Sequence, residues 1–162
     1  MRRTSLALCI AALTLGAAVP AGASGSNPHE VHANAAHPVP DRLSLDQGRK
    51  WSTDEALRRN MEEVRAALAQ RRDAILGDWL TPEQERALAG TIESRVAAIL
   101  TDCRLEPRAD ANLHFIVADL VRAADILQGK AKGPRREGAA LAVRATQMYA
   151  TYFDHPGWKR VF

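Results

Sequence analysis

The sequence predicts an all-α fold, an antiparallel up-down-up-down four-helix bundle. Three observations predict it. Four stretches carry apolar residues at helical spacing, residues typical of helix starts and stops flank them, and no stretch alternates as a β-strand would. Four helices of about 17 to 24 residues joined by short loops favour the up-down-up-down order. The apolar stripes repeat near seven residues, which suits shallow crossing angles.

The first two helices have recognisable starts. Ser52, with Glu55 three residues later, forms a capping-box pattern, so we expect the first helix to run from Ser52 to a stop at Gly77. Thr81 is the expected cap of the second helix, with Pro82 at its first position. The first apolar stripe consists of Leu57, Met61, Val64, Leu68 and Ile75. The second consists of Leu88, Ile92, Val96, Ile99 and Cys103.

The last two helices are separated by a basic connection. The third is expected from Pro107 to Gly129, and the fourth over residues 137–154, just before Pro156, which cannot continue a helix. Residues 130–136 between them are basic and expected to be solvated. The third stripe consists of Leu113, Ile116, Leu120, Ala124 and Leu127. The fourth consists of Leu141, Ala145, Met148 and Tyr152.

The N-terminal residues have the pattern of a secretory signal peptide. Arg2 and Arg3 precede an apolar run over residues 6–19, and small residues lead to Ala23, after which we expect cleavage. Spanning a membrane takes roughly 20 apolar residues, and no later run approaches that length. Residues 1–23 are therefore predicted to direct export, and the product is expected in the periplasm as a soluble protein without a membrane span.

Two segments follow the predicted signal peptide. Residues 24–50 are predicted to be a flexible leader, because most of the segment is rich in small and polar residues that bury little apolar surface. Leu43 and Leu45 at its end suggest an extended lead-in lying on the bundle domain, residues 51–162. Three leader histidines form a secondary candidate site for loosely bound metal, namely His29, His32 and His37.

The charge of the chain argues against nucleic acid as a partner. Cleavage after Ala23 removes two of the 22 basic residues and none of the 19 acidic ones, so the net charge falls from +3 to +1. Nucleic-acid-binding proteins normally present a strongly basic face. An unknown protein partner in the cell envelope is the remaining expectation.

One end of the predicted bundle gathers soft metal ligands. At about 1.5 Å per helical residue, Met61, His114 and Met148 lie at similar depths from that end. With Cys103 as a thiolate and His155 at the rim, these residues suit copper, zinc or haem iron. The aromatic residues expected to line this end are Trp51, Phe115, Tyr149, Tyr152, Phe153 and Trp158. Trp79 stands alone at the other end.

The same residues have a structural interpretation. Methionine on an apolar stripe fills irregular gaps in a core, and aromatic rings can seal an open bundle end. The chain is thus either a metal- or haem-binding protein or a ligand-free interaction or structural protein of the cell envelope. Geometry separates the two. If His114 points outward, or lies more than about 8 Å from both Met61 and Cys103, the metal site fails, because metal–ligand distances are about 2.0–2.3 Å.

Cys103 is the single cysteine that remains after the predicted cleavage. No internal disulfide can then form, and the thiol is a metal ligand, an intermolecular partner or a buried apolar filler. The chain is therefore expected to be a monomer or a Cys103-linked dimer.

The sequence carries no catalytic motif. It has no Gly-x-Ser-x-Gly elbow, no His-Glu-x-x-His, no glycine-rich phosphate loop and none of the helical Glu-x-x-His pairs of di-iron bundles. A Cys103–His114 nucleophile pair would lack an orienting third group and an oxyanion site. We expect no enzymatic activity.

Residues 58–64, Arg-Arg-Asn-Met-Glu-Glu-Val, resemble the first helix of the small periplasmic b-type cytochromes of the cytochrome c-prime-like bundle class. The resemblance implies a periplasmic four-helix bundle with non-covalent haem, in which Met61 matches the family's methionine ligand. The family's histidine ligand is not matched, because Tyr149 and Tyr152 stand at that part of the last helix. No Cys-x-x-Cys-His is present, so covalent c-type haem is excluded.

Three further features extend over the whole chain. They are the His-containing leader, a Leu-x-Leu-Asp-x-Gly-x-x-Trp entry from Leu43 to Trp51, and a Phe-Asp-His-Pro-Gly-Trp end from Phe153 to Trp158. In these features the chain is similar to short exported bacterial proteins of unassigned role that are sometimes labelled DnrO-like. That resemblance implies no activity.

Overall fold

The helices of the chain confirm the predicted all-α class. A computed structural model describes residues 43–162, and within them are five α-helices and no β-strand. The predicted signal peptide with its cleavage after Ala23 lies outside the described residues, as do the leader histidines His29, His32 and His37. No helix within residues 43–162 is both long enough and apolar enough to cross a lipid bilayer.

The first predicted helix is divided in two. α1 spans Glu55–Ala69 and α2 spans Arg72–Leu76. At the turn between α1 and α2 the residues are Gln70 and Arg71, and no residue of the apolar stripe falls there. A continuous helix would therefore bury no large apolar side chain at that turn. The Arg71 guanidinium instead donates to the Ala67 carbonyl at 2.9 Å and satisfies one of the free carbonyls at the end of α1.

The start of α1 corrects the capping box predicted at Ser52. Asp54 is the N-cap, and its carboxylate accepts the Leu57 backbone N–H at 2.7 Å. The chain before it is extended, because the Trp51 backbone N–H donates to the Tyr152 carbonyl at 2.8 Å. The helix begins only after the chain leaves that pairing.

The next two helices follow the sequence prediction closely. α3 spans Pro82–Asp102, and Thr81 forms with Gln84 the reciprocal capping box that the sequence predicts. α4 spans Pro107–Gln128 and ends at Gly129, whose φ of 74° lies in the left-handed region that glycine adopts without strain.

The last helix begins and ends two residues earlier than predicted. α5 spans Arg135–Tyr152, and Phe153 is already extended. The Phe153 backbone forms a parallel bridge with Trp51, and the Asp154 N–H donates to the Trp51 carbonyl at 2.8 Å. Pairing with the chain before α1 therefore ends α5 ahead of Pro156.

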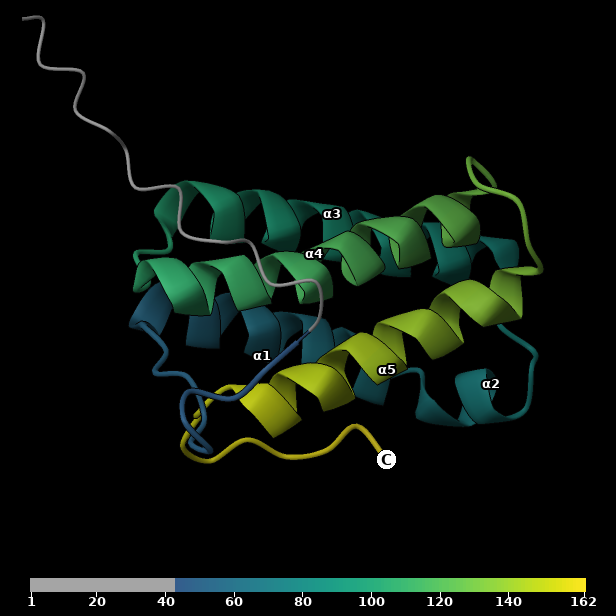
Figure 1. The fold of residues 1–162 in the computed structure, drawn as a ribbon. Coiled ribbons are helices and arrows are strands. Elements are labelled where there is room, and N and C mark those ends of the chain that lie inside the picture. The colour runs from purple at the N-terminus through teal and green to yellow at the C-terminus, as the bar shows by residue number, and fades with distance from the viewer. Residues whose placement is uncertain (1–42) are drawn as a thin grey trace, which may run out of the picture. The chain divides into compact units, whose positions relative to one another are not determined.

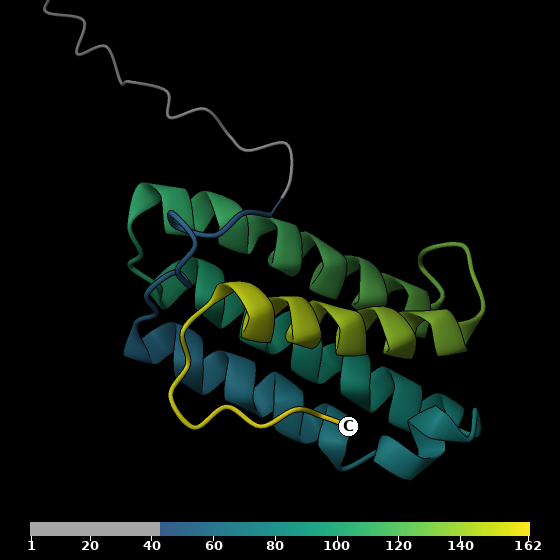
Figure 2. The ribbon, with the colours of Figure 1, turned by 60° about the horizontal axis from the view of Figure 1, so that its bottom comes forward.

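The four long helices lie side by side in Figures 1 and 2. α4 packs against α3 and α5, and α1 packs against the same two helices. α4 and α5 approach closely at Gly138, where an added Cβ would lie 2.8 Å from the Ala123 carbonyl oxygen. The largest fully buried side chains are Tyr149, Phe153, Leu57, Met61, Leu68, Leu88, Ile92, Ile99, Ile116, Leu120, Leu127 and Val64.

Two non-helical segments meet at the end where α1 starts and α5 ends (Figure 1). We name residues 43–54 the lead-in and residues 153–162 the strap. The Ser44 N–H donates to the Asn112 side-chain oxygen at 2.8 Å, which attaches the lead-in to α4. The Thr53 hydroxyl donates to the Asp154 carbonyl at 2.5 Å, which attaches it to the strap. These contacts lie at the end of the molecule at which the metal site was predicted.

Candidate functional site

The geometry does not place His114 in a site with Met61. Met61 has no exposed surface and belongs to the core between the helices. The His114 side chain is 59 % exposed, and its Nδ1 lies 2.8 Å from the carbonyl oxygen of Asp110, one turn earlier in α4. His114 therefore points outward, an orientation that does not favour the predicted metal site in which it is the imidazole ligand.

Cys103 is half-buried beside a carboxylate. Burial and the negative charge of Asp54 raise the pKa of the Cys103 thiol to about 12. Asp54 is fixed there, because it caps α1 and also accepts the Arg104 backbone N–H at 2.6 Å. The thiol thus stays protonated near neutral pH, which disfavours both a thiolate ligand and rapid disulfide formation.

The other two predicted ligands lie in different surroundings. Met148 is half-buried and packs against the core. His155 is half-buried on the strap, with its Nδ1 2.9 Å from the Tyr149 hydroxyl. A polar hollow of about 530 Å³ between the strap and α5 is lined by His155 but by none of the other four predicted ligands. No three His, Cys, Asp or Glu side chains converge on a metal position anywhere in residues 43–162.

Several of the predicted aromatic residues do gather at this end. Tyr149 stacks on Phe153 with ring centroids 5.5 Å apart, and Trp158 meets the Tyr149 ring edge-on at 4.8 Å. Trp51 is buried against the same segment, and its Nε1 donates to the Ser44 carbonyl at 2.7 Å. Phe115 on α4 and Tyr152 on α5 are half-buried. We name this region the closed end, because its rings are covered by the lead-in and the strap.

The polar atoms of the closed end are paired internally. Burial raises the pKa of the Tyr149 hydroxyl above its ordinary range and lowers that of the His155 imidazole. The protonated hydroxyl and the neutral ring therefore share a hydrogen bond across their 2.9 Å contact. Tyr149 belongs to the buried core, and the ring nitrogen of His155 that faces it is already engaged.

The opposite end carries two large apolar side chains that sequence reasoning did not select as a site. Leu76 is 60 % exposed and Trp79 is 59 % exposed. The indole lies over Gly77, where a Cβ would stand 2.3 Å from its Nε1, so a larger residue there would displace the indole. We name residues 76–80 the Trp79 tip. The available sequence signal was the position of Trp79, alone among the aromatic residues at this end.

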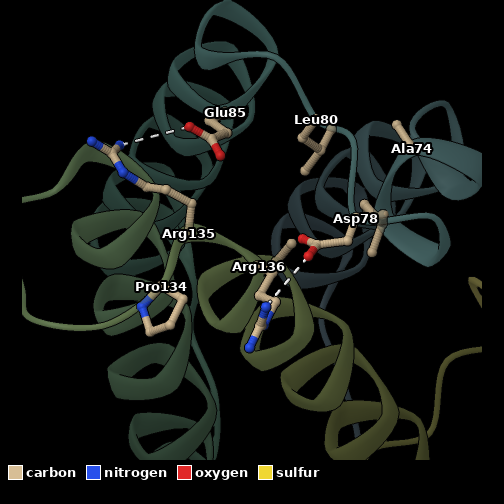
Figure 3. Close-up of a pocket in the computed structure, with 9 residues that line it drawn as sticks. Ala74, Asp78, Leu80, Glu85, Pro134, Arg135 and Arg136 are labelled. Atoms are coloured by element: carbon tan, nitrogen blue, oxygen red, sulfur yellow. Dashed lines mark hydrogen bonds and ion pairs between the residues drawn. The ribbon is translucent and has the colours of Figure 1, made fainter.

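The Trp79 tip adjoins the basic connection between α4 and α5, which we take as residues 130–136. Figure 3 shows Arg135 directed toward Glu85 and Arg136 toward Asp78, with N–O distances of 3.9 and 3.5 Å. A hollow of about 150 Å³ lies between the two segments and is lined both by apolar residues such as Ala74 and Leu80 and by the four charged residues of these ion pairs. An apolar turn and a basic segment thus share one surface.

Comparison with known proteins gives no information about the site. No protein-family model, no curated protein and no solved structure matches the sequence. The resemblances to DnrO-like proteins and to periplasmic b-type cytochromes accordingly stay predictions.

Proposed function

We propose that the chain is an exported, non-catalytic protein of the cell envelope, built as an antiparallel up-down-up-down four-helix bundle. In this proposal it acts by binding a partner through the Trp79 tip. The ring of helix contacts, α1 with α3, α3 with α4, α4 with α5 and α5 with α1, supports the bundle. The proposal is the ligand-free interaction alternative predicted from the sequence, now with a specific surface.

The observation that carries the proposal is the exposure of Leu76 and Trp79. Exposed apolar groups that lie together on a protein surface mark interaction sites more often than isolated ones do. Tryptophan is also among the residues most enriched where partners bind, because it offers a large rigid apolar area and one N–H donor. The chain turns at Asp78, whose φ is 56°, and the indole of Trp79 lies over Gly77.

Metal or haem binding is less well supported than an interaction surface. His114 and Cys103 line one shallow hollow of about 150 Å³, but Met61 is not part of its lining. His114 also has its Nδ1 engaged by Asp110, and the Cys103 thiol is held protonated. Binding of copper, zinc or non-covalent haem stays a prediction, as does the leader site of His29, His32 and His37 outside the described residues.

Site-specific photo-crosslinking in bacteria that express the full chain tests the interaction surface. A photoreactive phenylalanine analogue at position 79 is expected to form crosslinked products in the envelope fraction. The matched control is the same analogue at position 100, because Leu100 is also 59 % exposed but lies near the end of α3, away from the Trp79 tip. Equal yields at the two positions, or no product at position 79, would contradict the proposal.

A further inference from the structure

We propose that the partner of the Trp79 tip is the surface of an anionic phospholipid membrane, an inference that rests on the proposed function and names its partner. The chemistry of the surface is a combination of exposed apolar side chains and adjacent basic ones. Such a combination suits the interface of a bilayer, where apolar groups enter the headgroup region and cations meet lipid phosphates.

The apolar part of the surface consists of Leu76 and Trp79. Trp79 is the most exposed aromatic side chain within residues 43–162, and tryptophan is enriched at membrane interfaces because its ring is apolar and its Nε1–H stays hydrated. Leu76 is on the last turn of the short helix α2, three residues before Trp79. The tip can therefore enter the interface without unfolding any of the long helices.

The charged part of the surface is the basic connection. It holds four basic residues and no acidic one, in the order Lys130, Lys132, Arg135 and Arg136. All four are exposed. Charge complementarity with an anionic lipid surface is the feature that selects this partner over a purely apolar one.

The two parts are attached to each other. Arg136 pairs with Asp78, the residue directly before Trp79, and Arg135 pairs with Glu85 in the first turn of α3. The Arg136–Asp78 pair is exposed on both sides and 3.5 Å long, and exposed pairs of this kind contribute little to stability. In the Arg135–Glu85 pair the Glu85 side chain is only 12 % exposed. The Arg136 guanidinium can thus exchange a carboxylate for a lipid phosphate while the tip stays in place.

Lys130 forms an ion pair with Glu93 at 3.0 Å. Lys132 has no carboxylate partner among the described residues, and Arg135 also donates to the Leu127 carbonyl at the end of α4. Lys132 is therefore the cation of the basic connection that is most available for lipid.

Co-sedimentation of the full chain with lipid vesicles tests the inference. Binding is expected to phosphatidylcholine vesicles that contain phosphatidylglycerol, and not to phosphatidylcholine alone, and it is expected to decrease as salt is added. Trp79→Ala should weaken the partition coefficient about tenfold, and Lys132→Ala about fivefold at low salt. Trp79→Phe, which keeps an aromatic ring, should retain most of the binding.

The controls separate a lipid surface from other outcomes. Leu100→Ala removes an equally exposed side chain far from the tip and is expected to leave vesicle binding unchanged. Circular dichroism of each variant checks that it is folded. Equal binding by the wild type and Trp79→Ala, or no binding of the wild type to phosphatidylglycerol vesicles, overturns the lipid assignment. A protein crosslinked at position 79 together with no vesicle binding would leave the proposed interaction surface standing and replace the lipid with that protein.

Discussion

The closed end and the Trp79 tip present aromatic side chains in opposite ways. At the closed end Tyr149 and Phe153 have no exposed surface, whereas Trp79 at the other end is 59 % exposed. The difference comes from the chain that flanks each end. The lead-in and the strap pair with each other and cover the closed end, while the Trp79 tip has only short connections around it (Figure 2). Aromatic residues that cluster in a sequence can thus indicate a covered end of the core as readily as a binding site.

The polar atoms of the two ends show the same contrast. In the closed end Trp51 Nε1 donates to a backbone carbonyl, and the Tyr149 hydroxyl is hydrogen-bonded to His155. At the Trp79 tip the Arg136–Asp78 ion pair is long and exposed on both sides. Buried polar groups must be paired within the protein, whereas exposed ones can change partners at little cost.

Of the changes predicted for the two ends, truncation of Phe153 is expected to lower the free energy of unfolding the most. Phe153→Ala removes a fully buried ring that stacks on Tyr149, and such changes cost about 3–5 kcal/mol of unfolding free energy. Trp79→Ala is the matched control, expected within about 0.5 kcal/mol of the wild type because the side chain is exposed. Denaturant unfolding measures both, and similar losses for the two variants would mean that the ends do not differ as described.

Removal of the Tyr149 hydroxyl should have a smaller effect. Tyr149→Phe keeps the ring stacked on Phe153 but leaves His155 Nδ1 without its hydrogen-bond partner, for an expected loss of about 1 kcal/mol. Tyr152→Phe in the same turn, where the ring is only half-buried, serves as the control. An unchanged unfolding midpoint in Tyr149→Phe would show that the bond to His155 contributes nothing to the seal.

Acidification should weaken the closed end. Burial holds the pKa of His155 below its ordinary 6.5, with Glu62 opposing the shift and Arg58 and Arg65 adding to it. The unfolded chain then binds a proton first as the pH falls below 6.5, so the stabilising contribution is present above that value and is lost as the pH falls toward the folded-state pKa. Asp154 also faces the ring and opposes the shift.

The pH prediction is measured as the unfolding free energy of the wild type and His155→Gln at about pH 8 and about pH 5. The wild type should lose more stability on acidification than the variant does. Parallel losses in the two proteins would assign the pH dependence to other groups.

The smallest expected effect is that of His114→Ala on metal content. Because His114 points into solvent, its removal should leave the amount of bound copper, zinc or iron unchanged when the full chain is purified without an affinity tag and assayed by elemental mass spectrometry. Loss of near-stoichiometric metal in this variant would restore the predicted site and reverse the present interpretation of the closed end.

Much of the fold follows from patterns that are local in the sequence. The Thr81 capping box and the left-handed Gly129 depend on residues within one helical turn, so they were predictable. The N-cap at Asp54 and the end of α5 at Tyr152 were not, because both are set by pairing of the lead-in with the strap. Local capping rules cannot represent a bridge between segments so distant in the chain.

The candidate site was predictable only in outline. The sequence places aromatic residues at one bundle end, and Tyr149, Phe153 and Trp158 do meet there. His114 stands one position away from the apolar stripe of α4, to which its buried neighbour Leu113 belongs. A small rotation of the helix about its axis therefore decides whether the His114 side chain points into the core or outward. Leu76 was not selected as a surface residue, because the first helix was predicted to continue to Gly77 without the break between α1 and α2.

The bridge between Trp51 and Phe153 also constrains the order in which parts of the protein can fold during synthesis. The hydrogen bond from Thr53 to Asp154 joins residues 101 positions apart. A ribosome or an export channel delivers the N-terminal partner long before the C-terminal one, so α1, α3 and α4 can pair while the Trp51 ring still lacks its cover. The final cover forms only when the strap has emerged. A protein delayed at this stage would expose its aromatic end, and a chaperone or protease could distinguish it from the finished one.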